Sequence, residues 1–279
     1  MKLANGTHSV HSLAHAETFH PVVGPVTEAE ALYVRQLRLA DRLRSCHDEF
    51  VVWDVGLGAA ANPVTFLRST RDIASRVRIL SFDHTLEPLR FALGHTEHLD
   101  YLQGYEKALA GLLDSGNASF QNGAQQVRWE LCEGDFPTLL VSPGANDWLK
   151  PHAVMFDAFS PATNPAMWTQ PLFASLHRLL DPQKPCALPT YSRSTMLRVT
   201  LLLAGFFVGV GHATGKKEET TVAANTLDLI EEPLGREWLR RVERSSSAEP
   251  MWEPVYRQAP LSPETCLKLG QHPQFAWTQ

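Results

Sequence analysis

The stretch Val51-Val52-Trp53-Asp54-Val55-Gly56-Leu57-Gly58-Ala59-Ala60-Ala61-Asn62-Pro63 places a glycine-rich turn between an apolar strand and a helix. This order is typical of a nucleotide-type cofactor site at the carboxyl edge of a parallel sheet, because glycine lets the backbone approach the ligand. The turn lacks the third glycine of the dinucleotide fingerprint. Asp54, two residues before Gly56, instead suits the positively charged amino group of S-adenosylmethionine (SAM). A tight turn that binds no ligand is the alternative.

The composition is that of a globular chain, with 279 residues, 44% of them hydrophobic and 20% charged. The net charge of −5 argues against general affinity for nucleic acid, although it leaves room for a local basic face. The four cysteines are scattered without a Cys-x-x-Cys pair, so we expect reduced thiols in a cytoplasmic protein. We expect no membrane segment, because Arg198 and Gly205 interrupt the most apolar stretch and the N-terminus has no signal-peptide pattern.

Strands and helices alternate along the middle of the chain. Strands are predicted at residues 50–55, 77–82, 127–132, 153–157, 186–191, 206–210 and 220–224. Apolar residues at helical spacing predict helices at 98–113, 172–180 and 195–204. We therefore predict an α/β, Rossmann-like fold with a seven-stranded, mostly parallel sheet flanked by helices. The predicted domains are an N-terminal extension and helix at 1–48, a central domain at 49–225, and a C-terminal extension at 226–279 that packs on it.

The N-terminal region contains a helix start and four histidines. Thr27-Glu28-Ala29-Glu30 has the form of a capping box, with Thr27 as the N-cap. The histidines are His8, His11, His15 and His20. Their spacing suggests a metal site, but no cysteine or dense aspartate cluster accompanies them. We interpret them as polar lining residues and expect no metal.

Acidic residues stand at the ends of three predicted strands. Asp83, one strand beyond the glycines, is placed to accept hydrogen bonds from both ribose hydroxyls of a nucleotide-type ligand. Asp135 is placed to meet an adenine amino group, although a turn or helix cap explains it equally well. Asp157 ends the apolar strand at 153–157 and begins Asp157-Ala158-Phe159-Ser160-Pro161. A carboxylate and an aromatic ring there should lie beside the site opened by the first strand; a capped turn is the alternative.

Three stretches together resemble one family. The turn at 54–62 matches an acid-x-Gly-x-Gly-x-Gly-x-Asn pattern except at Ala60, and 157–161 matches an Asp-Ala-Phe-Ser-Pro block that continues with Asn164-Pro165 and Trp168. Thr190-Tyr191-Ser192 and Gly215-Lys216-Lys217-Glu218 look like the later strand and basic loop of the same family. The chain thus resembles the methyltransferase part of the MnmC family, which has the class I SAM-dependent methyltransferase fold and methylates the aminomethyl group of the wobble uridine of certain tRNAs.

The resemblance implies a cofactor, a set of site residues and a role for each. SAM would be held by Asp54, Gly56, Gly58, Asn62, Asp83, Asp135 and Asp157. Asp157 would also be catalytic, accepting the proton that an alkylammonium must lose before it attacks the methyl group. The substrate would be bound by Phe159, Pro161, Tyr191, Lys216 and Lys217. The lysine pair suits phosphate, but a solvated hairpin loop explains it at least as well.

The implied substrate partner is tRNA. No flavin-dependent oxidase domain is recognised here, so we expect methyl transfer alone, with a separate oxidoreductase acting at the same tRNA position. The tail after residue 225 has no recognised counterpart in the family. The alternatives are a SAM-dependent methyltransferase for a small amine or a protein, a nicotinamide-dependent oxidoreductase, and a noncatalytic scaffold of the same fold.

Overall fold

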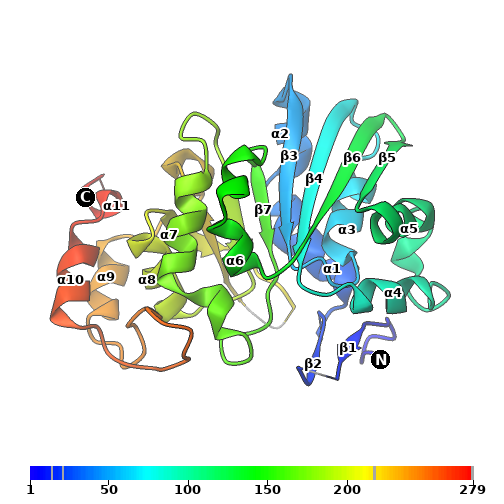
Figure 1. Ribbon diagram of the computed structural model, residues 1–279. Helices are drawn as coiled ribbons and strands as arrows, with labels where there is room; N and C mark the ends of the chain where they lie inside the picture. The colour runs from blue at the N-terminus through cyan, green and yellow to red at the C-terminus, as the bar shows by residue number, and fades with distance from the viewer. Residues whose placement is uncertain (14, 21, 216–217, 278–279) are drawn as a thin grey trace. The chain divides into compact units, whose positions relative to one another are not determined.

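The computed structural model describes residues 1–13, 15–20, 22–215 and 218–277 (Figure 1). The chain divides into two compact units. Unit 1 comprises Met1–Phe136, Pro151–Asp157 and His212–Glu218. Unit 2 comprises Pro137–Lys150, Ala158–Gly211 and Glu219–Gln279. Neither unit is continuous in sequence, because the chain passes from one to the other several times.

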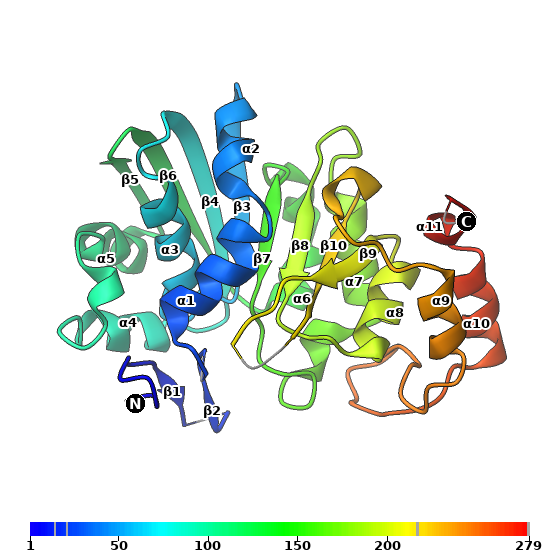
Figure 2. The ribbon, with the colours of Figure 1, turned by 180° about the vertical axis from the view of Figure 1, so that it is seen from behind.

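Unit 1 contains a short N-terminal hairpin, five further strands and the helices between them. The hairpin strands are β1 (His11–Ser12) and β2 (Glu17–Thr18), and the others are β3 (Glu49–Val55), β4 (Ser75–Asp83), β5 (Asn117–Asn122), β6 (Gln125–Glu133) and β7 (Ala153–Phe156). The helices are α1 (Pro25–Ala29), the π-helix η1 (Glu30–Arg35), α2 (Leu39–Ser45), α3 (Ala61–Thr70), α4 (Glu87–Leu93), the 3-10 helix η2 (Asp100–Leu102) and α5 (Glu106–Ser115). Figure 2 shows α1, α2 and α3 on one face of β3 and β4.

The strands of unit 1 run in the order β5-β6-β4-β3-β7. All neighbours are parallel except β5, which pairs antiparallel with β6. Val55 of β3 lies opposite Phe82 of β4 and Phe156 of β7. The residues that follow these three positions therefore meet at one edge of the sheet. The predicted α/β fold with mostly parallel strands is confirmed.

Strand β5 is the addition to the seven strands predicted from sequence. Its residues Asn117–Asn122 are polar except for an alanine and a phenylalanine, and exposed positions alternate with partly buried ones and, at Asn122, a buried one. A one-sided edge strand of this kind has no continuous apolar run to reveal it. The helix predicted at 98–113 is also shorter, because α5 begins at Glu106 after the turn of η2.

The predicted capping box is wrong. Helix α1 begins at Pro25, and Thr27 lies inside it. Gly24 is the N-cap residue with φ +87°, and Pro25 occupies the first helical turn, where its fixed φ and missing N–H are tolerated. The helix continues as the π-helix η1, which buries Tyr33. A glycine-proline start thus replaces the threonine cap.

Unit 2 contains three strands and the remaining helices. The strands are β8 (Ala187–Thr190), β9 (Phe207–Gly211) and β10 (Thr220–Ala224). The helices are α6 (Phe136–Leu140, beginning on the last residue of unit 1), η3 (Pro143–Asp147), η4 (Pro165–Trp168), α7 (Gln170–Leu179), α8 (Thr195–Leu203), η5 (Leu227–Leu229), α9 (Arg236–Val242), α10 (Pro263–Gly270) and α11 (Pro273–Trp277). Strand β10 lies between β8 and β9 and is antiparallel to both.

The C-terminal residues belong to the core of unit 2. Helix α10 packs on α8. Gln274 of α11 is fully buried; it accepts a hydrogen bond from the Val208 N–H at 2.7 Å and donates to the carbonyls of Val208 and Leu234 at 2.7 and 2.8 Å. These bonds anchor the end of the chain to β9. Among the described residues, no helix is long and apolar enough to cross a membrane.

Candidate active site

The glycine turn joins β3 to α3. Gly56 and Gly58 have φ of +93° and +52°, a region that favours glycine. The Gly56 N–H donates to the Phe82 carbonyl at 2.9 Å, which fastens the turn to β4. A Cβ added to Gly58 would lie 3.1 Å from the ring of Phe19. Glycine is therefore favoured at position 58 for two reasons: its φ is positive, and the Phe19 ring packs against it.

Ala60 occupies the position where the resemblance expects a third glycine. It is fully buried and has φ +60° and ψ +22°, so an alanine stands in a left-handed conformation at the N-cap of α3. That conformation costs an L-residue about 1–2 kcal/mol. The neighbouring Ala59 carbonyl accepts a hydrogen bond from the Tyr101 hydroxyl at 2.9 Å, which helps hold the turn.

Asp54 is fully buried near the end of β3. Its Oδ2 accepts a hydrogen bond from the Ser81 hydroxyl at 2.6 Å, and the Ser81 oxygen in turn accepts one from the Trp129 indole N–H at 2.9 Å. The Asp54 Oδ1 has no hydrogen-bond partner among the described residues. Burial raises the pKa of Asp54 to about 7 against the opposing Ser81 hydrogen bond, and the charges of Asp157 and Asp83 raise it further. A cationic group bound at Oδ1 would pair with this oxygen and favour the ionised form of the Asp54 carboxylate.

Asp83 ends β4 and is held by backbone donors. Its Oδ2 accepts the Gly58 N–H at 2.9 Å, and its Oδ1 accepts the Thr85 N–H at 3.2 Å. The His84 Nδ1 lies 3.4 Å from the same Oδ1, and this contact with Asp83 is the main cause of a raised pKa of His84. Asp135 is exposed and also raises the His84 pKa through its charge. The sequence placed Asp83 and Asp135 correctly at the ends of β4 and β6, while their ligand contacts stay predictions.

Asp157 follows β7 and meets the helix after the glycine turn. Asn62, 3% exposed in α3, donates from Nδ2 to the Asp157 Oδ2 at 2.8 Å. The Asn62 Oδ1 is buried and has no partner among the described residues. The Tyr33 hydroxyl donates to the Phe156 carbonyl at 3.1 Å and so supports the end of β7. The structure thus brings Asn62 and Asp157 into direct contact, a pairing that the sequence did not predict.

Sequence reasoning did not predict that His20 lies beside Asp157. Its Nε2 lies 3.4 Å from the Asp157 Oδ2, and its Nδ1 lies 3.9 Å from the Glu28 Oε2. The only sequence signal was the cluster of N-terminal histidines, which we interpreted as lining residues. Among the described residues, no group of three or more His, Cys, Asp or Glu side chains is arranged to hold a metal ion.

The predicted substrate residues of unit 2 surround the turn that follows Asp157. Phe159, Pro161 and Tyr191 are all half-buried. The Tyr191 hydroxyl donates to the Ala158 carbonyl at 3.0 Å, and the Trp168 indole donates to the Phe159 carbonyl at 2.7 Å. The rings of Trp168 and Tyr191 meet edge to face at 6.0 Å. Lys216 and Lys217, the predicted phosphate contacts, lie outside the described residues.

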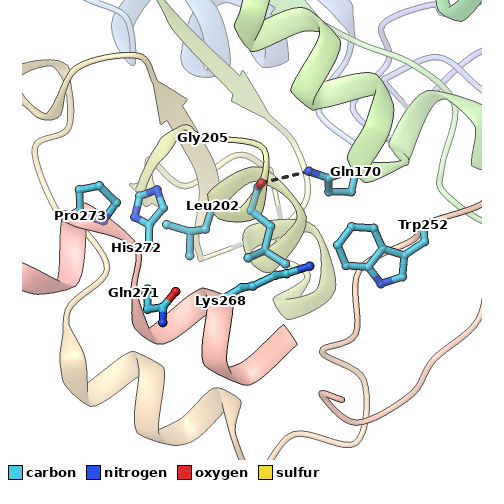
Figure 3. Close-up of a pocket in the computed structure, with 9 residues that line it drawn as sticks. Gln170, Leu202, Gly205, Trp252, Lys268, Gln271, His272 and Pro273 are labelled. Carbon is cyan, nitrogen blue, oxygen red and sulfur yellow. Dashed lines mark hydrogen bonds between the residues drawn. The ribbon is translucent and has the colours of Figure 1, made fainter. Parts of the chain in front are cut away.

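A separate hollow of about 390 Å³ lies within unit 2 (Figure 3). It is lined by Gln170, Leu202, Leu203, Gly205, Trp252, Lys268, Gln271, His272 and Pro273. The Gln170 amide donates to the Leu203 carbonyl at 3.0 Å, and the Lys268 ammonium pairs with Glu264 at 2.7 Å. The lining contains no carboxylate and none of the predicted site residues. It therefore does not fit a cationic ligand such as SAM.

Comparison with known proteins agrees with the chemistry of the acidic edge. Residues 106–226 match a family model described as S-adenosyl-L-methionine-dependent methyltransferase. The tRNA 5-methylaminomethyl-2-thiouridine biosynthesis bifunctional protein MnmC of Aeromonas hydrophila is 30% identical over 214 residues, which cover 70% of this chain and 30% of that protein. The MnmC of Campylobacter concisus is 25% identical over 224 residues, which cover 78% and 34%. The chain is an MnmC-like SAM-dependent methyltransferase.

A solved structure extends the likeness of this methyltransferase to nearly its whole length. MnmC2 from Aquifex aeolicus superimposes with a TM-score of 0.69 over 96% of this chain and 83% of that chain, at 22% identity. At this identity the match shows the fold. The chain spans about a third of the length of the curated relatives, 34% and 30% for the two above. The family model begins after the glycine turn, so the case for Asp54, Asn62 and Asp83 as site residues comes from their geometry.

Proposed function

We propose that this methyltransferase transfers the methyl group of SAM to the aminomethyl group of a modified wobble uridine in tRNA. The names of the curated relatives support this acceptor. The main support for SAM as cofactor is the cluster of Asp54, Asp83 and Asp157 where β3, β4 and β7 end. One buried oxygen of Asp54 has no partner among the described residues.

The charge of this cluster favours SAM over a nicotinamide dinucleotide. SAM carries positive charge on its amino group and on its sulfonium, and both are attracted by neighbouring carboxylates. A dinucleotide would bring its negatively charged pyrophosphate to the glycine turn. There the pyrophosphate would meet the Asp83 carboxylate, which already accepts the hydrogen bond of the Gly58 N–H. Electrostatic repulsion therefore disfavours the oxidoreductase alternative.

Each site residue has a proposed role. Asp54 and the backbone of Gly56 and Gly58 hold the methionine end of SAM, with Asn62 closing this side through its unpaired Oδ1. Asp83 accepts the ribose hydroxyls with the lone pairs that its backbone donors leave free, and Asp135 meets the adenine amino group. When bound, SAM supplies an electrophilic methyl group attached to its sulfonium.

Asp157 prepares the acceptor nitrogen. The substrate aminomethyl group is an ammonium in water, and its nitrogen has no lone pair until a proton leaves. The Asn62 N–H holds the Asp157 Oδ2 at 2.8 Å and so orients the carboxylate. We assign proton acceptance to Asp157. Orientation of the acceptor nitrogen towards the methyl group and exclusion of water supply the rest of the rate enhancement.

The remaining predicted residues bind the RNA. We assign Phe159, Pro161 and Tyr191 to the flipped base, where aromatic rings stack on bases. Lys216 and Lys217 would contact phosphates. The methyltransferase domain is assigned to 49–225, with extensions at 1–48 and 226–279. The proposal places the protein in the cytoplasm, with tRNA and with a separate oxidoreductase that acts at the same uridine.

Transfer of labelled methyl groups tests the proposal. Purified protein is incubated with labelled SAM and with tRNA that carries the unmethylated aminomethyl uridine, and the nucleosides are then separated. We expect label in the wobble nucleoside and none in tRNA that lacks the aminomethyl group. SAM binding measured by calorimetry, together with label in a small amine or a protein but not in tRNA, would replace the tRNA assignment. Binding of NAD without SAM would overturn the methyltransferase itself.

A further inference from the structure

His20 is a buried histidine that lies between two carboxylates. It is 9% exposed, with Nε2 at 3.4 Å from Asp157 and Nδ1 at 3.9 Å from Glu28. The two carboxylates come from different elements, since Glu28 is in α1 and Asp157 follows β7. An imidazole accepts a proton on one nitrogen and releases one from the other, which makes it suited to proton transfer between two such groups.

The backbone around His20 is built to hold the ring there. His20 has φ +48°, a left-handed conformation that is uncommon for residues other than glycine, although asparagine, aspartate and histidine adopt it more often than the rest. The preceding Phe19 is anchored to the first residues of the chain: its N–H donates to the Val10 carbonyl at 2.9 Å, and its carbonyl accepts a hydrogen bond from the Ser9 hydroxyl. Strained backbone that the surroundings hold in place is concentrated at functional sites.

Orientation of Asp157 does not by itself require His20. Asn62 already donates to the Asp157 Oδ2 at the shorter distance of 2.8 Å. The Asn62 amide cannot carry a proton away, whereas a histidine can. The side chain of Glu28 is 15% exposed, so a proton that reaches it has contact with water. Among the residues that the structure describes, the ion-pair partners of the His20 ring are Asp157 and Glu28.

We propose that His20 is a positioning residue for methyl transfer, which holds Asp157 and passes the proton taken from the substrate on to Glu28. The inference rests on the proposed role of Asp157 as proton acceptor. The ammonium nitrogen keeps its electron pair as its proton moves to Asp157. The Asp157 proton then moves to Nε2 of His20, whose own proton is on Nδ1. That Nδ1 proton passes through a water molecule to Glu28, because 3.9 Å is too long for a direct hydrogen bond, and from there to solvent. Asp157 is ionised again, and the ring ends neutral in its other tautomer.

The test compares His20→Ala with His20→Asn, because asparagine tolerates the left-handed backbone. Both variants should lower kcat by about 10²-fold, the usual contribution of a positioned proton-transfer group. KM for SAM should stay within about twofold, since His20 does not hold the cofactor in this proposal. Added imidazole should restore part of the rate of His20→Ala. His47→Gln, at an exposed position outside the site, is the matched control.

A second variant separates the relay from simple packing. Glu28→Gln should lower kcat, and imidazole should not restore it, because the missing group lies beyond the ring. A loss of rate in His20→Ala that imidazole does not restore, accompanied by an equal loss of SAM affinity, would show a structural role and overturn the proposal. Unchanged kcat in both His20 variants would also overturn it.

A measurement without any methyl acceptor tests the coupling of His20 independently of the identity of the substrate. Nitrogen-15 spectra of the His20 ring need no tRNA. We expect Asp157→Asn and Glu28→Gln each to change the His20 ring signals while those of His47 stay unchanged. If tRNA receives no label but these signals respond, the acceptor assignment fails and the coupling of His20 stands. Signals that respond to neither variant would overturn the coupling itself.

Discussion

The acidic edge of unit 1 and the hollow of unit 2 differ in how their polar groups are satisfied. At the acidic edge, buried oxygens of Asp54 and Asn62 have no partner among the described residues, and burial raises the pKa of Asp54 to about 7. In the hollow, Lys268 pairs with Glu264, and Gln170 with the Leu203 carbonyl. Burial also lowers the pKa of His272 there to about 4, so its ring is neutral near pH 7.

A concave shape alone therefore does not mark the site. The hollow has volume, but the polar groups of Gln170, Trp252, Lys268 and His272 have partners within unit 2. The acidic edge keeps uncompensated charge and unpaired oxygens, which cost stability unless a ligand satisfies them. We therefore expect substitutions at the acidic edge to change binding and catalysis strongly, and substitutions in the hollow to change neither.

The largest effect is expected for Asp157→Asn. An amide cannot accept the ammonium proton, so kcat should fall by about 10³-fold, within the range of general base catalysis. SAM affinity, measured by calorimetry, should change much less. Asp147→Asn, at an exposed position in η3, is the control and should transfer methyl groups at the wild-type rate. Full activity in Asp157→Asn would remove Asp157 from the mechanism.

Asp54→Asn should weaken SAM binding by about 10- to 100-fold, because it replaces a charged partner of the SAM amino group with a neutral one. The same change should stabilise the ligand-free protein at neutral pH. The folded-state pKa of Asp54 is raised from 3.8 to about 7, so wild-type stability falls as pH rises through that window and is lowest above it. A shift of this size corresponds to up to about 4 kcal/mol.

Chemical denaturation at several pH values, with the exposed Asp72→Asn as control, measures this effect. The Asp54→Asn variant should lack the part of the pH dependence that lies between about pH 4 and about pH 7. A variant that is less stable than wild type at high pH would contradict the idea that Asp54 is held there at a cost.

SAM affinity should itself depend on pH. A cation binds the ionised form of Asp54, so below about pH 7 binding must release a proton, and affinity should rise by up to about tenfold per pH unit until it levels off. Calorimetry in buffers of different ionisation enthalpy counts that proton. Asp54→Asn should abolish this part of the pH dependence. A wild-type affinity that does not vary with pH would separate Asp54 from the cationic ligand.

Ala60→Gly should stabilise the protein slightly. Glycine removes the left-handed strain at φ +60° but adds freedom to the unfolded chain, so the net gain is about 0.5–1 kcal/mol. Thermal unfolding measures it, with Ala162→Gly at an exposed loop position as the control that should not stabilise. Destabilisation by Ala60→Gly would mean that the methyl group contributes more through packing than its backbone costs.

The smallest effect is expected in the hollow. Lys268→Ala removes an exposed ion pair with Glu264 and a contact with the Trp252 ring at 5.8 Å. Such exposed pairs contribute about 0–1 kcal/mol. SAM affinity and methyl transfer should stay at wild-type values in the assays used for Asp157→Asn. A strong loss of either would show that the hollow takes part in the reaction.

Prediction from sequence succeeded where the signal is local. The apolar run of β3 and the glycines after it gave the strand and the turn, and apolar β7 gave the position of Asp157. Prediction failed where the sequence signal is weak, or where other residues than the expected ones start an element. Polar β5 has no apolar run, and Gly24-Pro25 starts α1 where Thr27 was expected to cap it.

The gathering of Asp54, Asp83 and Asp157 at one edge follows from the sequence, because the carboxyl ends of adjacent parallel strands converge there. The contacts of these carboxylates follow from the packing of the whole molecule. The Asn62–Asp157 bond, the Ser81 hydroxyl on Asp54 and the approach of His20 join residues far apart in the chain. Their distances depend on strand register and helix placement, and the raised pKa of Asp54 depends on burial, a property of the packed molecule that no short stretch of sequence specifies.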